Sequence, residues 1–281
     1  MGNIYNIKFS FYPIFVFIKV KGFNIMIKYF ERLEPDYDMM IRHSEKMFEE
    51  SYDKVNMMLF EDHYLTEDVS SSFADSIKKF FTELILAFKN FGRSLKEDMD
   101  YAAREKDIKV KLKNLRENLN QKYDEGNNYV YITDVWAYQK EYEKAVKDLD
   151  KFAKRFTKTK YQSTFQIDDD LMEFYDRCDK YDKKLDELSE KKIKVDLVKA
   201  IEFVEAELRG DSFIFQSIND YTRELEGYKR SAETLNEKYR ALGAKVIPKH
   251  VSLIKQCTTR ISKFIRKHAA KFIAKTVFYF A

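Results

Sequence analysis

The sequence predicts an all-α protein, an elongated bundle of five or six long amphipathic helices with coiled-coil-like seams. Glycine and proline together supply only ten of the 281 residues, against an average usage of about 12%. Few turns are therefore available, and the elements must be long. Charged residues (35%) and apolar residues (44%) are interspersed, which is typical of amphipathic helices. Apolar residues also recur at alternating spacings of three and four, the pattern of a helical seam.

The first expected helix begins near Pro35 and runs to Leu59, with a methionine-rich apolar stripe. A second helix is expected from the serines at 70–72, whose hydroxyls can cap its first turn. Its pattern extends to Lys122, with a break or kink expected near Gly92 or Asp107. The seam of its first half consists of Ile77, Phe81, Leu84, Phe88, Phe91 and Leu95.

Residues 129–132 have a briefly strand-like pattern, and Asp134 is expected to cap a third helix. A fourth helix is expected to start at the three aspartates 168–170, because acids suit the positive end of the helix dipole. Its apolar pattern continues as far as Gly210. The seam of the third helix consists of Val135, Tyr138, Tyr142, Ala145, Leu149, Phe152 and Phe156.

The most regular seam runs from Ile218 to Leu242 and is closed by Gly243. A helix with such a seam needs a partner along its whole length. Pro248 is then expected to open the last helix. That helix has isoleucines, Phe272 and His268 on one side, with cations between them.

Charge is strongly segregated along the chain. Residues 1–30 carry four lysines and no acid, and residues 238–281 carry eleven basic residues and no acid. The remaining 36 basic and 47 acidic residues give the middle a net charge of −11. Three regions follow: a basic apolar tail (1–30), an acidic helical body (31–243) and a basic amphipathic helix (244–281).

The N-terminal tail has two interpretations: it is part of the protein, or it lies upstream of the true start. Met26 is an alternative start, which would leave the first 25 residues untranslated. The sequence contains no run of eighteen apolar residues, so no transmembrane helix is predicted. Pro13 interrupts the apolar stretch and no small-residue cleavage site follows it, so secretion is not expected. The expected location is therefore cytoplasmic.

Motifs with a known chemical mechanism are missing from the sequence. It contains no phosphate-binding Gly-Lys-Ser/Thr loop, no His-Glu-x-x-His and no Cys-x-x-Cys. We therefore expect no enzyme activity, no cofactor and no metal. His63 is expected in a solvated loop. His268 is expected to be a satisfied or partly exposed structural histidine, with the alternative role of a pH-sensitive group. The 168–170 aspartates are expected to cap a helix rather than to bind a cation, and Cys178 and Cys257 to be buried and unlinked.

The basic C-terminal helix is the candidate site for an anionic partner. Its cations alternate with apolar residues, which suits a membrane surface, a nucleic acid, an acidic protein or the acidic middle of the same chain. All four interpretations stay open at the level of sequence. The candidate residues are Lys255, Arg260, Lys263, Arg266, Lys267, Lys271 and Lys275.

One segment resembles known proteins in its amphipathic pattern. Residues 70–118, with Ser-Ser-Ser-Phe-Ala-Asp-Ser-Ile-Lys-Lys-Phe-Phe leading into Phe-Lys-Asn-Phe-Gly-Arg-Ser-Leu-Lys-Glu-Asp-Met, resemble amphipathic helices of uncharacterised virion-associated proteins in phages of low-GC gut bacteria. The resemblance covers under a fifth of the chain and contains no diagnostic motif. It implies a structural or assembly role and, as the alternative to a cytoplasmic location, a virion-associated one.

The expected function is accordingly that of a non-enzymatic structural or interaction protein, working through helix packing and charge complementarity. A protein partner or self-association is the leading expectation. The alternatives are a peripheral membrane protein that binds anionic lipid through the C-terminal helix, and non-specific nucleic-acid binding through the same helix. No small-molecule substrate is inferred.

Overall fold

The computed structural model describes residues 14–20, 23–29, 70–105, 107–121, 129–209, 212–242 and 246–277. The chain divides into two compact units, residues 1–40 and residues 41–281. The first expected helix, Pro35 to Leu59, lies outside the described residues.

The described part of the first unit is a β-hairpin. Strand β1 (Ile14–Val20) pairs antiparallel with β2 (Phe23–Tyr29), so that Ile14 lies opposite Tyr29 and Val20 opposite Phe23. These strands were not predicted, because a short continuous apolar run does not by itself distinguish a strand from other buried segments. Met26 lies within β2, and the alternative start at this residue stays a prediction.

The second unit is formed mainly by helices, and the all-α class is confirmed. Five of the described helices have 24 residues or more, and two are shorter. They are α2 (Ser70–Glu105), α3 (Ile108–Gln121), α4 (Val135–Lys158), α5 (Thr164–Glu190), α6 (Leu197–Leu208), α7 (Phe213–Leu242) and α8 (Val246–Val277).

The expected break in the second helix occurs at Asp107 and not at Gly92. Asp107 has φ 49°, a left-handed conformation that a regular helix does not contain, and it separates α2 from α3. Helix α2 continues through Gly92, where an added Cβ would lie 3.0 Å from Cγ2 of Ile218 on α7. Gly92 therefore permits the close approach of α2 and α7.

Side-chain caps fix where α4 and α5 begin. Asp134 accepts a hydrogen bond from the backbone N–H of Ala137 (3.1 Å), as the sequence predicts. The predicted start of α5 at Asp168 is wrong, because Ser163 caps that helix by accepting from the N–H of Gln166. A capping hydroxyl therefore starts the helix four residues before the first aspartate.

The expected continuation of α5 to Gly210 is also wrong. Helix α5 ends at Glu190, and strand β4 (Lys192–Asp196) pairs antiparallel with β3 (Tyr129–Thr133). Alternating β-branched residues on both strands suit this pairing. Asp196 then caps the separate helix α6 through the N–H groups of Val198 and Lys199.

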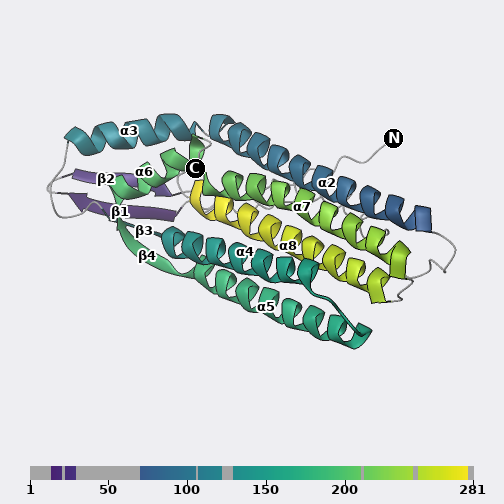
Figure 1. The fold of residues 1–281 in the computed structure, drawn as a ribbon. Helices are drawn as coiled ribbons and strands as arrows, with labels where there is room; N and C mark the ends of the chain where they lie inside the picture. Colours follow the sequence, from purple (N-terminus) through teal and green to yellow (C-terminus); the bar gives the residue numbers. More distant parts are fainter. Residues whose placement is uncertain are drawn as a thin grey trace, which may run out of the picture. The chain divides into compact units, whose positions relative to one another are not determined.

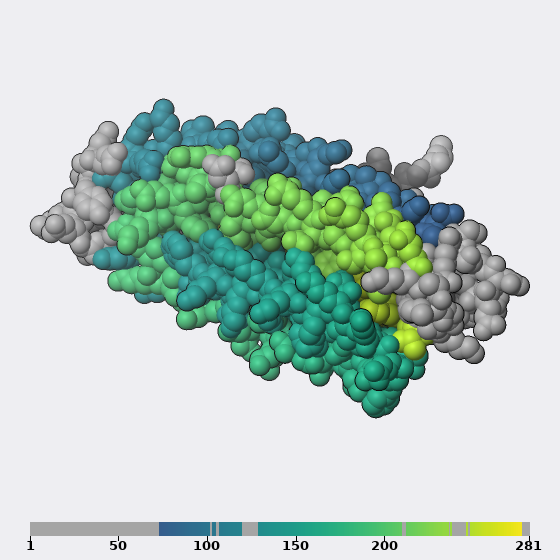
Figure 2. Space-filling view, viewed as in Figure 1, coloured from purple at the N-terminus to yellow at the C-terminus, as the bar shows by residue number. Residues whose placement is uncertain are grey.

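Helix α8 is the centre of the second unit. It packs against α5, α4, α7, α2 and α6, and Figure 1 shows it beside α7 and next to α4 and α5. In the space-filling view little of α8 (yellow) is visible on this face, whereas α4 and α5 (teal) form much of the surface (Figure 2). The seam expected for the third helix, Val135 to Phe156, is buried. The first part of the seam that begins at Ile218 is also buried, as far as Ala232.

Candidate functional site

The basic C-terminal helix packs on its own chain. Its large apolar side chains are buried, and so are several of its polar ones. Three of the buried hydroxyls donate to carbonyls of the preceding turn: Thr258 to Ile254 (2.9 Å), Ser262 to Thr258 (2.8 Å) and Thr276 to Phe272 (2.8 Å). These bonds satisfy the hydroxyls locally, so α8 can occupy the core despite its polar sequence.

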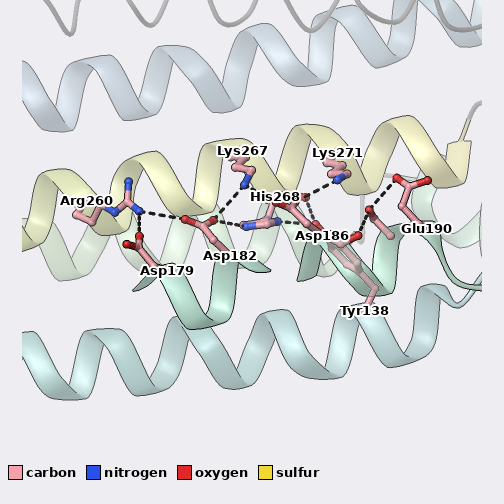
Figure 3. A network of polar contacts seen from close by, with 10 residues as sticks. Tyr138, Asp179, Asp182, Asp186, Glu190, Arg260, Lys267, His268 and Lys271 are labelled. Atoms are coloured by element: carbon pink, nitrogen blue, oxygen red, sulfur yellow. Dashed lines mark hydrogen bonds and ion pairs between the residues drawn. The ribbon is translucent and has the colours of Figure 1, made fainter. Parts of the chain in front are cut away.

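Cations on one side of α8 face acids on α5 (Figure 3). The two helices run parallel here, because higher-numbered cations pair with higher-numbered acids. We call these residues the charge ladder. It consists of Arg260, Lys267, His268, Lys271 and Lys275 on α8 with Asp179, Asp182, Asp186 and Glu190 on α5.

The ladder contains four of the seven predicted anion-binding residues. Arg260 binds Asp182 (3.1 Å) and also Asp179, and Lys267 binds Asp186 (2.9 Å). Lys271 also binds Asp186 (3.1 Å). Lys275 binds Glu190 (3.4 Å). These cations therefore already have anionic partners within the chain.

The other three predicted residues lie elsewhere on α8. Lys255 is fully buried, with its ammonium 5.0 Å from the ring centroid of Phe80 on α2 and near the Ser76 hydroxyl. Lys263 and Arg266 are half-buried. Burial, together with the charges of Arg260 and Arg266, lowers the pKa of Lys263. The structure therefore does not gather the seven cations into one exposed surface.

His268 is the most buried member of the ladder. Its Nε2 lies 2.7 Å from Oδ1 of Asp182, and its Nδ1 lies 2.9 Å from the hydroxyl of Tyr138 on α4. A neutral imidazole fits both contacts, donating to the carboxylate and accepting from the phenol. Burial lowers the pKa of His268, although the Asp182 carboxylate acts in the opposite direction. Burial also raises the pKa of Tyr138.

The Asp182–His268–Tyr138 chain joins three helices and holds them in register. Burial alone would raise the pKa of Asp182, but the hydrogen bond from His268 and the charge of Lys267 bring it below its ordinary value. The Tyr138 side chain is only 2% exposed. Its protonated phenol and the neutral imidazole therefore act as structural hydrogen-bonding groups in this geometry.

We expect the protein to lose stability as the pH falls from 7 to 5. Burial lowers the pKa of His268 and of His250, which lies 2.7 Å from the carbonyl of Phe156. As the pH falls, the unfolded chain therefore binds protons at a higher pH than the folded chain does. The stability that the two neutral histidines contribute is complete above about pH 6.5 and is lost below it. Each unit by which the pKa of a histidine differs between the folded and the unfolded chain corresponds to about 1.4 kcal/mol of stability.

Chemical denaturation at pH 7 and pH 5 measures this effect. In the variant His268→Gln, which keeps an amide donor and acceptor, the loss between the two pH values should be smaller than in the unmodified protein. An equal loss in both proteins would show that His268 does not titrate on unfolding.

A row of exposed lysines runs along the surface of α4. Five lysines lie opposite its buried seam, at spacings of 4, 3, 4 and 7 residues, and their side chains are exposed. Residues three or four apart share one face of a helix, so the row extends for about 27 Å along the axis. We call these residues the lysine stripe: Lys140, Lys144, Lys147, Lys151 and Lys158.

The stripe differs from the charge ladder in its partners. Among the described residues, none of its five ammonium groups makes an ion pair, whereas Lys154 of the same helix binds Asp150 (2.8 Å) and Glu224 (2.6 Å). The acids beside it have other donors: Glu143 accepts from Gln139, and Asp148 accepts from Arg177 and Tyr181. These acids and four of the lysines line a shallow, open depression.

The lysine stripe was not predicted from the sequence. The net charge of −11 across the middle of the chain concealed a local cationic face, because acids on the flanks of α4 cancel it in the sum. The helical spacing of the lysines was the available signal. The spacing did not show which of these lysines have ion-pair partners, because the packing of the helices determines those partners.

The remaining predicted residues have structural roles or lie outside the described chain. Cys178 and Cys257 are buried and unlinked, as expected, and burial raises the pKa of Cys178 to about 12. The capping role predicted for the aspartates is wrong: Asp168 binds Lys249 (2.6 Å) and Asp170 binds Arg155 (3.1 Å). His63 lies outside the described residues.

No group of three or more His, Cys, Asp or Glu residues in the described part of the chain is placed to hold a metal ion. None of the helices described has the length and apolar character that crossing a membrane requires. Comparisons with protein-family models, with curated proteins and with solved structures found no match to this chain.

Proposed function

We propose that this is a non-enzymatic helical interaction protein that binds the phosphate backbone of nucleic acid through the lysine stripe, without sequence specificity. The observation that carries the proposal is the contrast between two sets of cations. Those of the charge ladder are neutralised within the fold, whereas those of the stripe are exposed and ion-paired to no described residue. The ammonium groups of the stripe are therefore accessible to an external anion.

The composition of the stripe favours a phosphate backbone over an acidic protein. Lysine binds phosphate and carboxylate alike as a point charge, and the fork of arginine suits both anions, so the distinction depends on the residues that accompany the charges. Protein interfaces rely on buried apolar and aromatic anchors and contain few charges at their centre. The stripe contains five lysines and no apolar anchor between Lys140 and Lys158.

The same composition weakens the membrane interpretation. An interfacial helix inserts an apolar face beside its cations. On α8 that apolar face is buried within the fold, with Ile261 and Ile265 fully covered. On α4 the face opposite the stripe is the buried seam. The resemblance of residues 70–118 to phage virion-associated proteins supports a structural or assembly role, which a nucleic-acid-binding surface would suit.

Neutralising four lysines of the stripe tests the proposal. The variant K140Q/K144Q/K147Q/K151Q should bind a fluorescein-labelled duplex of 20 base pairs more weakly than the unmodified protein in anisotropy titrations. When binding releases counterions, the logarithm of the binding constant falls linearly with log[salt]. The slope is about 0.9 for each phosphate contact on duplex DNA. Losing four contacts should therefore reduce the slope by about 3 to 4.

A matched control removes the same charge from other helices. The variant K79Q/K109Q/K183Q/K199Q changes one exposed lysine on each of α2, α3, α5 and α6. It should keep most of the affinity and of the salt slope. An equal loss in both variants would show that only net charge matters. Binding to polyglutamate or to phosphatidylserine vesicles in preference to the duplex would contradict the proposal.

A further inference from the structure

The ribbon that precedes α4 presents tyrosines and lysines on its outer face. Tyr129 and Tyr131 of β3 are 53% and 61% exposed, and Lys192 and Lys194 of β4 are also exposed. We call these four residues the ribbon face. The opposite side of the ribbon, which includes Val130, Ile132 and Val195, is buried, and both strands contact α6.

The register of the ribbon places the lysines among the rings. Tyr131 pairs with Lys194 across the two strands, and the Lys194 ammonium lies 4.3 Å from the centroid of the Tyr129 ring. Alternate residues of a strand point to the same side, so the two tyrosine rings share the outer face. An aromatic surface flanked by ammonium groups is thus fixed on a paired backbone.

The ribbon is joined directly to the helix that carries the lysine stripe. Asp134 is the single residue between β3 and α4. Trp136, in the first turn of α4, precedes Lys140 by four residues and so lies on the same helical face. Its indole is 39% exposed and packs edge-on against Phe203 of α6 (5.3 Å between ring centroids). Exposed aromatic residues thus lead along the chain into the stripe.

We infer that the ribbon face binds the unpaired bases of single-stranded nucleic acid, with the bases stacked on Tyr129 and Tyr131 and the adjacent phosphates neutralised by Lys192 and Lys194. This inference rests on the proposed function and specifies its ligand. Aromatic rings beside cations are the general means of holding single strands, since every base has a π-face. In a duplex those faces are already stacked, so the ribbon face distinguishes a single strand from a duplex.

The test compares one 20-nucleotide strand of mixed sequence, alone and annealed to its complement, by fluorescence anisotropy. The variant Y129A/Y131A should lose at least about fivefold in single-strand affinity for each ring removed. Its duplex affinity should stay within about twofold of the unmodified protein. The variant Y129F/Y131F keeps the rings and should bind normally, as should Y101A, which removes an exposed tyrosine from α2.

A second measurement does not depend on the variants folding. Ultraviolet cross-linking of the unmodified protein to a strand containing 5-iodouracil should label Tyr129 or Tyr131. Cross-links confined to other residues would overturn the inference. Equal affinity for strand and duplex, unchanged by Y129A/Y131A, would also overturn it while leaving the lysine stripe intact. If the stripe variant binds both forms as tightly as the unmodified protein, the proposed function itself fails.

Discussion

Deleting residues 248–281 should leave a chain that does not fold cooperatively. This deletion removes nearly all of α8, which contacts five other helices. Eight large apolar side chains that it removes are buried: Val251, Leu253, Ile254, Ile261, Phe264, Ile265, Phe272 and Ile273. At about 1.5–3 kcal/mol each, their burial contributes about 12–24 kcal/mol, which equals or exceeds the 5–15 kcal/mol that typically separates a folded domain from its unfolded state.

Size-exclusion chromatography and thermal melting by circular dichroism measure this outcome. The deleted protein should aggregate through the exposed seams of α4 and α7, or show no cooperative transition. A chain that starts at Met26 is the control, because the residues it lacks belong to the other compact unit, and it should keep the melting temperature. If the deletion variant melts cooperatively at the temperature of the intact protein, α8 is not the centre of the core.

The substitution Asp182→Ala should cost about 3 kcal/mol of unfolding free energy, the largest effect expected of a single residue in the charge ladder. Its carboxylate contacts Arg260, Lys267 and the fully buried His268. Its removal leaves the buried Nε2–H of His268 without an acceptor, which costs about 1–3 kcal/mol, and it also removes the partly exposed ion pairs with Arg260 and Lys267, which contribute about 1 kcal/mol or less each.

Asp186→Ala is the matched control, one helical turn further along α5. Its side chain is 42% exposed, against 18% for Asp182, and its partners are Lys267 and Lys271. Solvent-exposed pairs contribute about 1 kcal/mol or less, so this variant should stay close to the unmodified protein. Urea denaturation of both variants gives the comparison. Equal losses would mean that burial does not determine the strength of the ladder.

Local patterns in the sequence were sufficient for the helical class, most helix boundaries and the buried seams. The seam of α4, from Val135 to Phe156, is buried as its spacing predicts. The cap at Asp134 also follows from a local rule, because a short oxygen-bearing side chain satisfies the first N–H groups of a helix. These features depend on residues within a turn or two of one another, so sequence spacing determines them.

Features that depend on distant partners were not predictable in this way. Strand β4 interrupts an apolar pattern that continues into α6, and it exists because β3, some sixty residues earlier, supplies its partner. The interpretation of the charges also depended on the fold. The sequence showed that residues 238–281 are basic, but it could not show which of these cations meet α5.

Tertiary structure alone decided which cations remain available to an external partner. On α8 the ammonium groups face carboxylates brought there by packing, and Lys267 and Lys271 share Asp186. On α4 the same residue type faces outward because the opposite side of the helix is apolar and buried. The sequence by itself determined that α4 is amphipathic and that lysines occupy its polar side. Whether a lysine is neutralised depends on which carboxylates lie within a few ångströms, and only the packing of the helices sets those distances.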